Sequence, residues 1–314
     1  MEFNSIQDFR SNFTQVYHKS VVPMLAPYET ERININGKFK ILAVVVLILF
    51  VLLGLSYLGI LGERFQRPPV YTLFVVPIMF CVFCMKMMSK NFENKLKSTV
   101  MPNLMKAFGN FVWTTAYVID TQTVKDTKIF SKFDHKDNDD NFFGTYKGLS
   151  ININETELYY YRKDSRDRLK KEIEFKGVLV EIDVKKPFKG HTIIRNRCYL
   201  FNDSAYEEVK LEDPEFSKLY YVDSNDQVES RYLLTTSFME RYKNIKNAFG
   251  GSSIEASFKN NKLILAISTE RDLFKLGRLG CPVNDTKQFT ELLNEFVSIL
   301  AIVDELKLNQ NIGL

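Results

Sequence analysis

The chain has 314 residues, of which 25% are charged and 45% apolar, and its formal net charge is +4. This composition is typical of a globular protein and excludes a disordered or fibrous chain. So small a net charge gives no reason to expect nucleic acid as a partner. The mean hydropathy of −0.16 means that any membrane segment is a minority of the chain.

The first expected element, within residues 1–40, is an amphipathic helix on the cytoplasmic side of a membrane. Its apolar residues recur at helical spacing, namely Ile6, Phe9, Phe13, Val16 and Tyr17. Pro23 and Pro27 should interrupt this helix. A further helix should then lead into the membrane.

Two apolar segments within residues 41–88 predict a transmembrane hairpin. Residues 41–61 hold no charged side chain, and as a helix they span about 30 Å, the thickness of a hydrocarbon core. Backbone polar groups in lipid must bond within their own segment, so the segment should be helical. The second segment covers residues 70–88, with Pro77 in its middle. A buried soluble hairpin is the alternative, but the first segment has no polar face.

The loop of residues 62–69 is so short that both termini should lie on one side of the membrane. Seven Lys and Arg residues flank the hairpin on that side and two lie in the loop, so the positive-inside rule predicts cytoplasmic termini. Four of the flanking lysines could also attract anionic lipid, although such clusters commonly do no more than set topology: Lys86, Lys90, Lys95 and Lys97.

The cysteines indicate neither a metal nor a cofactor. Cys81 and Cys84 are three residues apart in the second segment, where small apolar side chains are favoured over a metal pair or a lipidation site. Cys198 and Cys281 could form a disulfide, but a cytoplasmic location would keep them reduced. No metal-ligand spacing of Cys or His occurs, so no metal site is expected.

Residues 89–141 predict a juxtamembrane helix followed by a linker. Apolar residues recur every four positions from Phe92 to Phe108, which indicates one buried stripe. The run FDHKDNDD at residues 133–140 predicts an exposed loop. An EF-hand is excluded, because the run has no glycine at the sixth position and no closing glutamate.

Residues 142–314 predict an α+β domain with a mainly antiparallel sheet and flanking helices. Strand pairs are expected for residues 146–153 with 157–161, 173–184 with 191–195, 219–222 with 227–234, and 252–258 with 262–267. The basic run of residues 162–171 contains Asp164 and Asp167, so it predicts a solvated hairpin tip rather than a nucleic-acid surface.

Two helices of this domain carry apolar stripes that should pack on the sheet, at residues 235–249 and 286–308. Ser237 and Glu240 form a capping box at the start of the first. Asp285 should cap the second, whose stripe could alternatively form a dimer seam.

Few polar side chains suit a ligand site. Glu229 and Arg231 would share one face of the expected strand 227–234, with Asp226 in the preceding turn and Glu212 and Glu215 as further candidates. A carboxylate beside an arginine could bind a ligand or act in acid–base chemistry. An exposed cross-strand ion pair is the commoner arrangement. The three histidines lack partners at ligand spacing, and His191 is expected to face solvent.

Several short motifs resemble a bacterial family known as domain of unknown function 3137. They are Asp140–Gly144, Phe175–Gly177 with Phe188–Gly190, Val209–Phe216, Tyr221–Gln227, Arg231–Thr235 and Ile302–Leu308. The resemblance implies an N-terminal helix, two membrane segments and a cytoplasmic α+β domain in the bacterial inner membrane. It implies no activity.

These expectations favour a non-enzymatic scaffold or binding module, anchored in the bilayer, that presents a cytoplasmic domain to a protein partner or an anionic lipid surface. A membrane-tethered enzyme with a site of scattered polar residues is the alternative. Transport is a poorer fit, because two segments without a buried charge make no pathway unless several copies assemble as a homo-oligomer.

Overall fold

The computed structural model describes residues 6–60, 62, 68–185, 187–197, 203–249, 253–306 and 308. The chain divides into two compact units. One contains Met1–Thr14, Met105–Phe274 and Glu291–Leu314, and the other contains Gln15–Leu104 and Lys275–Thr290. Of the two cysteines considered for a disulfide, Cys281 is not in one and Cys198 lies outside the described residues.

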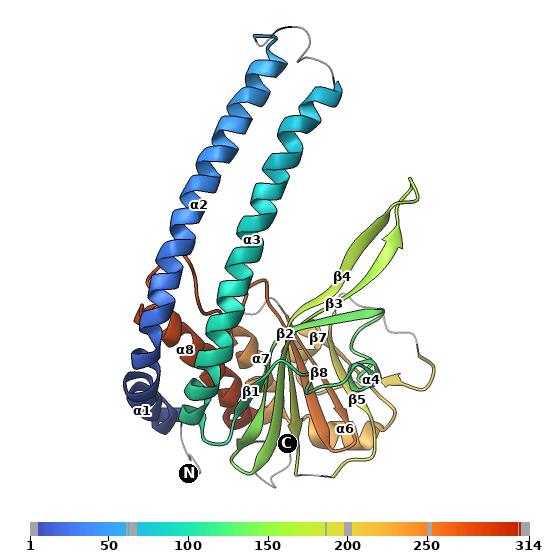
Figure 1. Ribbon diagram of the computed structural model, residues 1–314. Coiled ribbons are helices and arrows are strands. Elements are labelled where there is room, and N and C mark those ends of the chain that lie inside the picture. Colours follow the sequence, from blue (N-terminus) through green and yellow to red (C-terminus); the bar gives the residue numbers. More distant parts are fainter. Residues whose placement is uncertain are drawn as a thin grey trace. The chain divides into compact units, whose positions relative to one another are not determined.

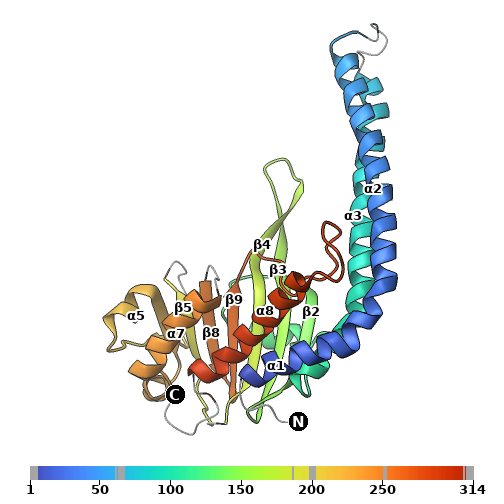
Figure 2. The ribbon, with the colours of Figure 1, turned by 90° about the vertical axis from the view of Figure 1, so that its left-hand side faces the viewer.

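Two long helices, α2 (Val22–Tyr57) and α3 (Pro68–Met105), form most of the second unit and run side by side (Figures 1 and 2). Each holds an 18-residue window apolar enough to cross a membrane, and 6% and 0% of these windows are buried inside the protein. A soluble core hairpin would bury these windows, so their exposure argues against that alternative. The two long apolar helices expected from the sequence are confirmed.

The N-terminal helix does not stop at the prolines, so the expected interruption is wrong. Helix α1 (Ile6–Val16) passes through one π-helical segment, η1 (Tyr17–Val21), directly into α2. Pro23 is in the first turn of α2, which follows directly on the π-helical segment. Pro27 lies inside α2 without ending it.

A segment from late in the chain packs on the helices of the second unit. The Arg32 guanidinium donates a hydrogen bond of 2.9 Å to the carbonyl oxygen of Leu279 and lies 2.6 Å from the Glu29 carboxylate. Glu29 also accepts a hydrogen bond of 2.8 Å from the N–H of Val283. The bond from Arg32 lowers the pKa of Glu29. Residues 275–290 are thereby fixed to the part of α2 that precedes the apolar window.

The first unit is built on an antiparallel sheet. Within the described residues it has nine strands in the order β1-β2-β3-β4-β9-β8-β5-β7-β6, and each of their pairings is antiparallel. The strands are β1 Val112–Thr114, β2 His135–Tyr146, β3 Leu149–Lys163, β4 Leu169–Asp183, β5 Thr192–Asn196, β6 Glu207–Glu208, β7 Tyr220–Ser224, β8 Ser253–Lys259 and β9 Lys262–Ser268. The expected α+β class with an antiparallel sheet is confirmed.

Helices cover both faces of this sheet. On one face lie α7 (Thr236–Phe249) and the part of α8 (Thr286–Leu306) from residue 291 onward, as Figure 2 shows. There Phe296 packs on Phe142, with 5.3 Å between ring centroids, and Phe238 packs on Phe258 at 5.7 Å. On the other face, α4 (Thr121–Asp126) and its neighbouring loops bury Ile119, Val124, Ile129 and Phe133 against Leu158, Phe175, Leu179, Ile193 and Ala266. Two short helices complete the unit, α5 (Pro214–Leu219) and α6 (Gln227–Leu233).

The expected loop at residues 133–140 is wrong, because β2 begins at His135. Lys136 and Asp140 are buried, whereas His135, Asp137 and Asp139 are exposed, as expected. The Lys136 ammonium donates to the carbonyl oxygen of Ile119, and Asp140 accepts a 2.7 Å bond from the Trp113 indole. Lys136 and Asp140 can be buried because hydrogen bonds within the protein replace those that they would make to water.

Other pairings also differ from expectation. The β2–β3 turn lies at Lys147 and Gly148, both with positive φ, rather than at residues 154 and 155. Strand β5 pairs with β7 and β8, and β4 pairs with β9 instead.

Helix α7 begins after Thr235, whose hydroxyl accepts a hydrogen bond from the N–H of Phe238, so the expected cap at Ser237 is wrong. The hairpin β8–β9 and a last helix with a buried stripe are confirmed.

Candidate functional site

Asp226, Glu229 and Arg231 lie on a helix rather than a strand, so the expected pairing of residues 227–234 is wrong. Asp226 is the N-cap of α6, and its carboxylate accepts from the N–H groups of Val228 and Glu229 at 3.1 and 2.9 Å. Side chains two positions apart point in nearly opposite directions on a helix, whereas on a strand they share a face. Glu229 and Arg231 therefore do not form the expected pair.

Glu229 holds the loop before β5. Its two carboxylate oxygens accept from the N–H groups of Lys189 and Gly190 at 2.9 and 2.6 Å. Asn225 accepts from the N–H of His191 at 2.7 Å. A Cβ at Gly190 would lie 2.6 Å from Glu229 and 2.9 Å from Asp226, so glycine permits this close approach. Asp226 and Glu229 thus act as backbone caps.

Replacing Glu229 with alanine should lower the free energy of unfolding by about 1–3 kcal/mol, because two backbone donors lose a charged acceptor. Replacing Arg231 with alanine on the same helix should change it by less than about 0.5 kcal/mol, since that side chain is exposed. The single tryptophan, Trp113 on β1, reports unfolding of this unit by its fluorescence. Equal stability of the two variants would contradict the assigned cap.

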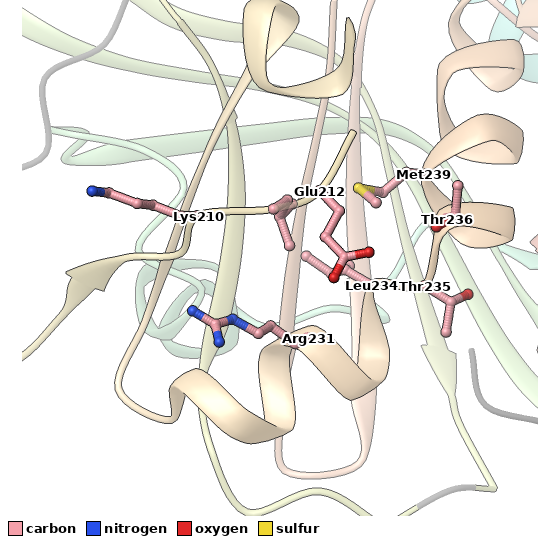
Figure 3. A pocket seen from close by; sticks show the side chains of 8 residues that line it. Lys210, Glu212, Arg231, Leu234, Thr235, Thr236 and Met239 are labelled. Atoms are coloured by element: carbon pink, nitrogen blue, oxygen red, sulfur yellow. The ribbon is translucent and has the colours of Figure 1, made fainter. Parts of the chain in front are cut away.

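Arg231 instead lines a pocket of about 430 Å³ beside α6 and the start of α7. Its other lining residues are Lys210, Leu211, Glu212, Leu234, Thr235, Thr236 and Met239. In Figure 3 the side chains of Lys210 and Arg231 extend to the same side, and the Glu212 carboxylate points away from both. Leu234 and Met239 are buried, whereas the three charged side chains are exposed. The pocket therefore has an apolar floor and a rim with charges of both signs.

The four lysines after the second apolar segment differ in their surroundings. Lys86 and Lys90 are exposed on α3. Lys95 is exposed but pairs with Glu31 at 2.6 Å, a contact that raises its pKa. Lys97 is 3% exposed and lies 3.3 Å from Glu93, so it is not available to a lipid surface.

His191 is buried, so the expectation that it faces solvent is wrong. Its ring nitrogens lie 2.8 Å from the Tyr206 hydroxyl, 2.8 Å from the Ser257 hydroxyl and 3.2 Å from the carbonyl oxygen of Thr127. Burial, and then the positive charge of Lys259, lowers the pKa of His191 to about 4. These partners come from distant parts of the sequence, so no local pattern could indicate them.

The pKa of His191 predicts a loss of stability in acid. The folded state holds the ring neutral down to about pH 4, whereas an unfolded histidine takes up a proton near pH 6.5. The contribution is complete above pH 6.5 and is lost as the pH falls to 4, a loss of about 3 kcal/mol. Replacing His191 with glutamine should remove this part of the pH dependence of unfolding, followed by Trp113 fluorescence. An unchanged pH profile would contradict it.

A second buried polar group was also missed from the sequence. The Arg195 guanidinium on β5 lies 3.3 Å from the Asp223 carboxylate on β7. Glu255 on β8 accepts from the backbone and side-chain nitrogens of Asn196 at 3.2 and 3.3 Å. Burial raises the pKa values of Asp223 and Glu255, and it lowers that of Arg195. The arrangement ties three neighbouring strands together.

Three carboxylates on β2 and β3 come close enough to hold a cation. One oxygen each of Asp139, Asp140 and Glu155 lies within 4.8 Å of the others. Two of them already accept hydrogen bonds, Asp140 from the indole of Trp113 at 2.7 Å and Glu155 from the N–H of Leu273 at 2.8 Å. These bonds give Asp140 and Glu155 a structural role.

Comparison with known proteins gives little functional information. No curated protein matches the chain. The crystal structure of the mycobacterial trehalose monomycolate transport factor A, TtfA, aligns with 52% of this chain and 73% of its own, at 9% identity and a TM-score of 0.29. At this low similarity, TtfA gives no information about the function of this chain.

The family comparison covers most of the sheet unit. Residues 173–308 match the family model described as protein of unknown function (DUF3137). All the motifs that carried the resemblance lie in this range except Asp140–Gly144. Through residues 173–308, the chain is therefore similar to the DUF3137 family.

Proposed function

We propose that this protein is a non-enzymatic binding module of the bacterial inner membrane. Helices α2 and α3 form its anchor, both termini are cytoplasmic, and the sheet unit binds a protein partner in the cytoplasm. The two exposed apolar windows and the excess of seven basic residues over two support this orientation. Lys86 and Lys90 contact the lipid headgroups at the end of the anchor.

The main support for a binding role is the pocket beside α6. Asp226 and Glu229 are used as caps, so the polar groups left for a partner are the exposed Lys210, Glu212 and Arg231. Buried apolar side chains at the centre and charges at the rim are the usual composition of a protein interface. Among the lining residues that the structure describes, Glu212 is the single carboxylate, so two carboxylates cannot share acid–base work there.

The test is photocrosslinking of the full-length chain in native membranes. A photoreactive amino acid replaces Lys210 at the pocket rim, and the control carries it at Lys218, which is exposed on α5. The proposal predicts one discrete adduct at position 210 that is lost on the change Arg231→Glu and is absent at position 218. A product of twice the chain's mass would identify a second copy as the partner. Equal labelling at both positions would contradict the assignment of the pocket.

A further inference from the structure

Strands β3 and β4 continue beyond the rest of the sheet as a two-stranded arm, visible in Figures 1 and 2. The pairing of β2 with β3 ends at His135 and Tyr159, and the pairing of β9 with β4 ends at Ser268 and Gly177. Residues 160–172 therefore pair only with each other. Together with Ile173, which pairs with Tyr159, we call them the arm. Its turn is closed by Asp164, whose carboxylate lies 2.8 Å from the Arg168 guanidinium.

The arm holds most of the chain's excess positive charge. It contains six basic and three acidic residues, a net charge of +3 against +4 for the whole chain. Arg162 and Arg166 are exposed and form no ion pair with any residue that the structure describes, whereas Lys163 and Lys170 pair with carboxylates of the arm at 2.7 and 3.0 Å. Two unneutralised guanidinium groups thus lie close to the tip.

Apolar side chains are exposed between these charges. Tyr161, Leu169 and Ile173 are 47%, 69% and 56% exposed. The register pairs Tyr161 with Lys171 and Lys163 with Leu169, and cross-strand partners share a face of the arm. One face therefore combines three apolar side chains with Lys163 and Lys171, which pair with Asp167 and Glu157. Arg162 lies on the opposite face, beside Lys170.

We propose that the arm docks on the anionic phospholipid surface of the membrane that holds α2 and α3; this rests on the proposed anchor. Basic residues with aromatic and aliphatic side chains suit a headgroup layer. A stable protein interface needs about 800 Å² on each side, and three exposed apolar side chains offer far less.

The experiment uses the full chain, with its four cysteines replaced and Ser165→Cys at the arm tip carrying a fluorophore. The protein is reconstituted into vesicles of phosphatidylcholine alone or with phosphatidylglycerol, each containing a lipid-bound quencher. The arm variant is R162Q/R166Q. The matched control K189Q/K218Q removes the same charge from two exposed lysines elsewhere in the sheet unit. Resistance to alkaline carbonate extraction reports the anchor separately.

Strong quenching is expected with phosphatidylglycerol, weak quenching with phosphatidylcholine alone, and loss of the difference in about 1 M salt. R162Q/R166Q should reduce the ratio of docked to undocked arm about 30-fold, and K189Q/K218Q should leave it unchanged. Absent quenching in carbonate-resistant protein would overturn the arm proposal alone, as would an equal effect of both double variants. If the fluorophore at position 165 were shielded from solvent in native membranes but not quenched in these vesicles, the arm would contact a protein partner and not lipid, and the arm proposal would be overturned. Extraction by carbonate would overturn the anchor itself.

Discussion

Replacing Gly177 with alanine is expected to prevent the sheet unit from folding. Gly177 on β4 has a φ of +154° and pairs with Ser268 of the neighbouring strand β9. A Cβ there would lie 2.1 Å from the carbonyl oxygen of Ile267 and 3.0 Å from the Cα of Ser268. Both are backbone atoms of a paired strand, so they cannot move aside without breaking the β4–β9 ladder. The cost should exceed about 4 kcal/mol.

The measurement is the yield of folded protein in membranes together with the thermal unfolding midpoint from Trp113 fluorescence. Gly280→Ala is the control, because a Cβ at that position meets no atom within 4 Å. The control should resemble wild type, and Gly177→Ala should give protease-sensitive protein or none. A Gly177→Ala protein with the wild-type midpoint would show that the backbone of β9 is free to shift.

The second large effect concerns the buried charges around Arg195. Arg195→Met should lower the free energy of unfolding by about 3–5 kcal/mol at pH 7, because it leaves Asp223 and Glu255 buried without their cation. Burial already raises the pKa values of both carboxyls, and loss of the arginine raises them further. A carboxyl group whose pKa is higher in the folded state than in the unfolded state stabilises the folded state at low pH. This contribution is lost as the pH rises through the folded-state pKa. The damage should therefore diminish toward pH 5.

The triple change Arg195→Met, Asp223→Asn and Glu255→Gln separates loss of charge balance from loss of packing. It removes the buried carboxylates along with the cation, so it should recover much of the lost stability at pH 7 and show little pH dependence. Unfolding of the single and triple variants between pH 5 and 8 is compared by Trp113 fluorescence. A single variant that is equally unstable at both ends of this range would contradict the electrostatic account.

Local patterns in the sequence were sufficient for part of the fold. The helices of the second unit follow from two long apolar segments, and the hairpin β8–β9 follows from two apolar runs joined by a short turn. The stripe of α8 follows from periodicity, because that helix buries one face. The tip between β3 and β4 also lies where its charges indicated.

Long-range pairing could not be predicted in the same way. Strand β2 contains Lys136 and Asp140, whose burial depends on Ile119 and Trp113. The neighbours of β5 were wrong because the β8–β9 hairpin lies between β4 and β5 in the sheet. Sequence order alone does not show such an insertion.

The expected strand at residues 227–234 was wrong, and the sequence contained a signal for the helix found there. Asp226 followed by Glu229 has the spacing of a capping box, which indicates a helix start at residue 227. The alternation of Glu229 and Arg231 was interpreted as a strand instead. With a helix in place, Arg231 is separated from the two carboxylates and joins Lys210 and Glu212, which the sequence places about twenty residues earlier.

Labelling of single cysteines in intact cells tests most directly the claim that a membrane hairpin holds the sheet unit in the cytoplasm. In a cysteine-free chain, Gln66→Cys marks the loop between α2 and α3, and Lys218→Cys marks the exposed surface of α5. If the hairpin spans the membrane with cytoplasmic termini, a membrane-impermeant maleimide should label position 66 in intact cells and position 218 only after permeabilisation. Labelling of position 218 in intact cells, or of both positions alike, would contradict it.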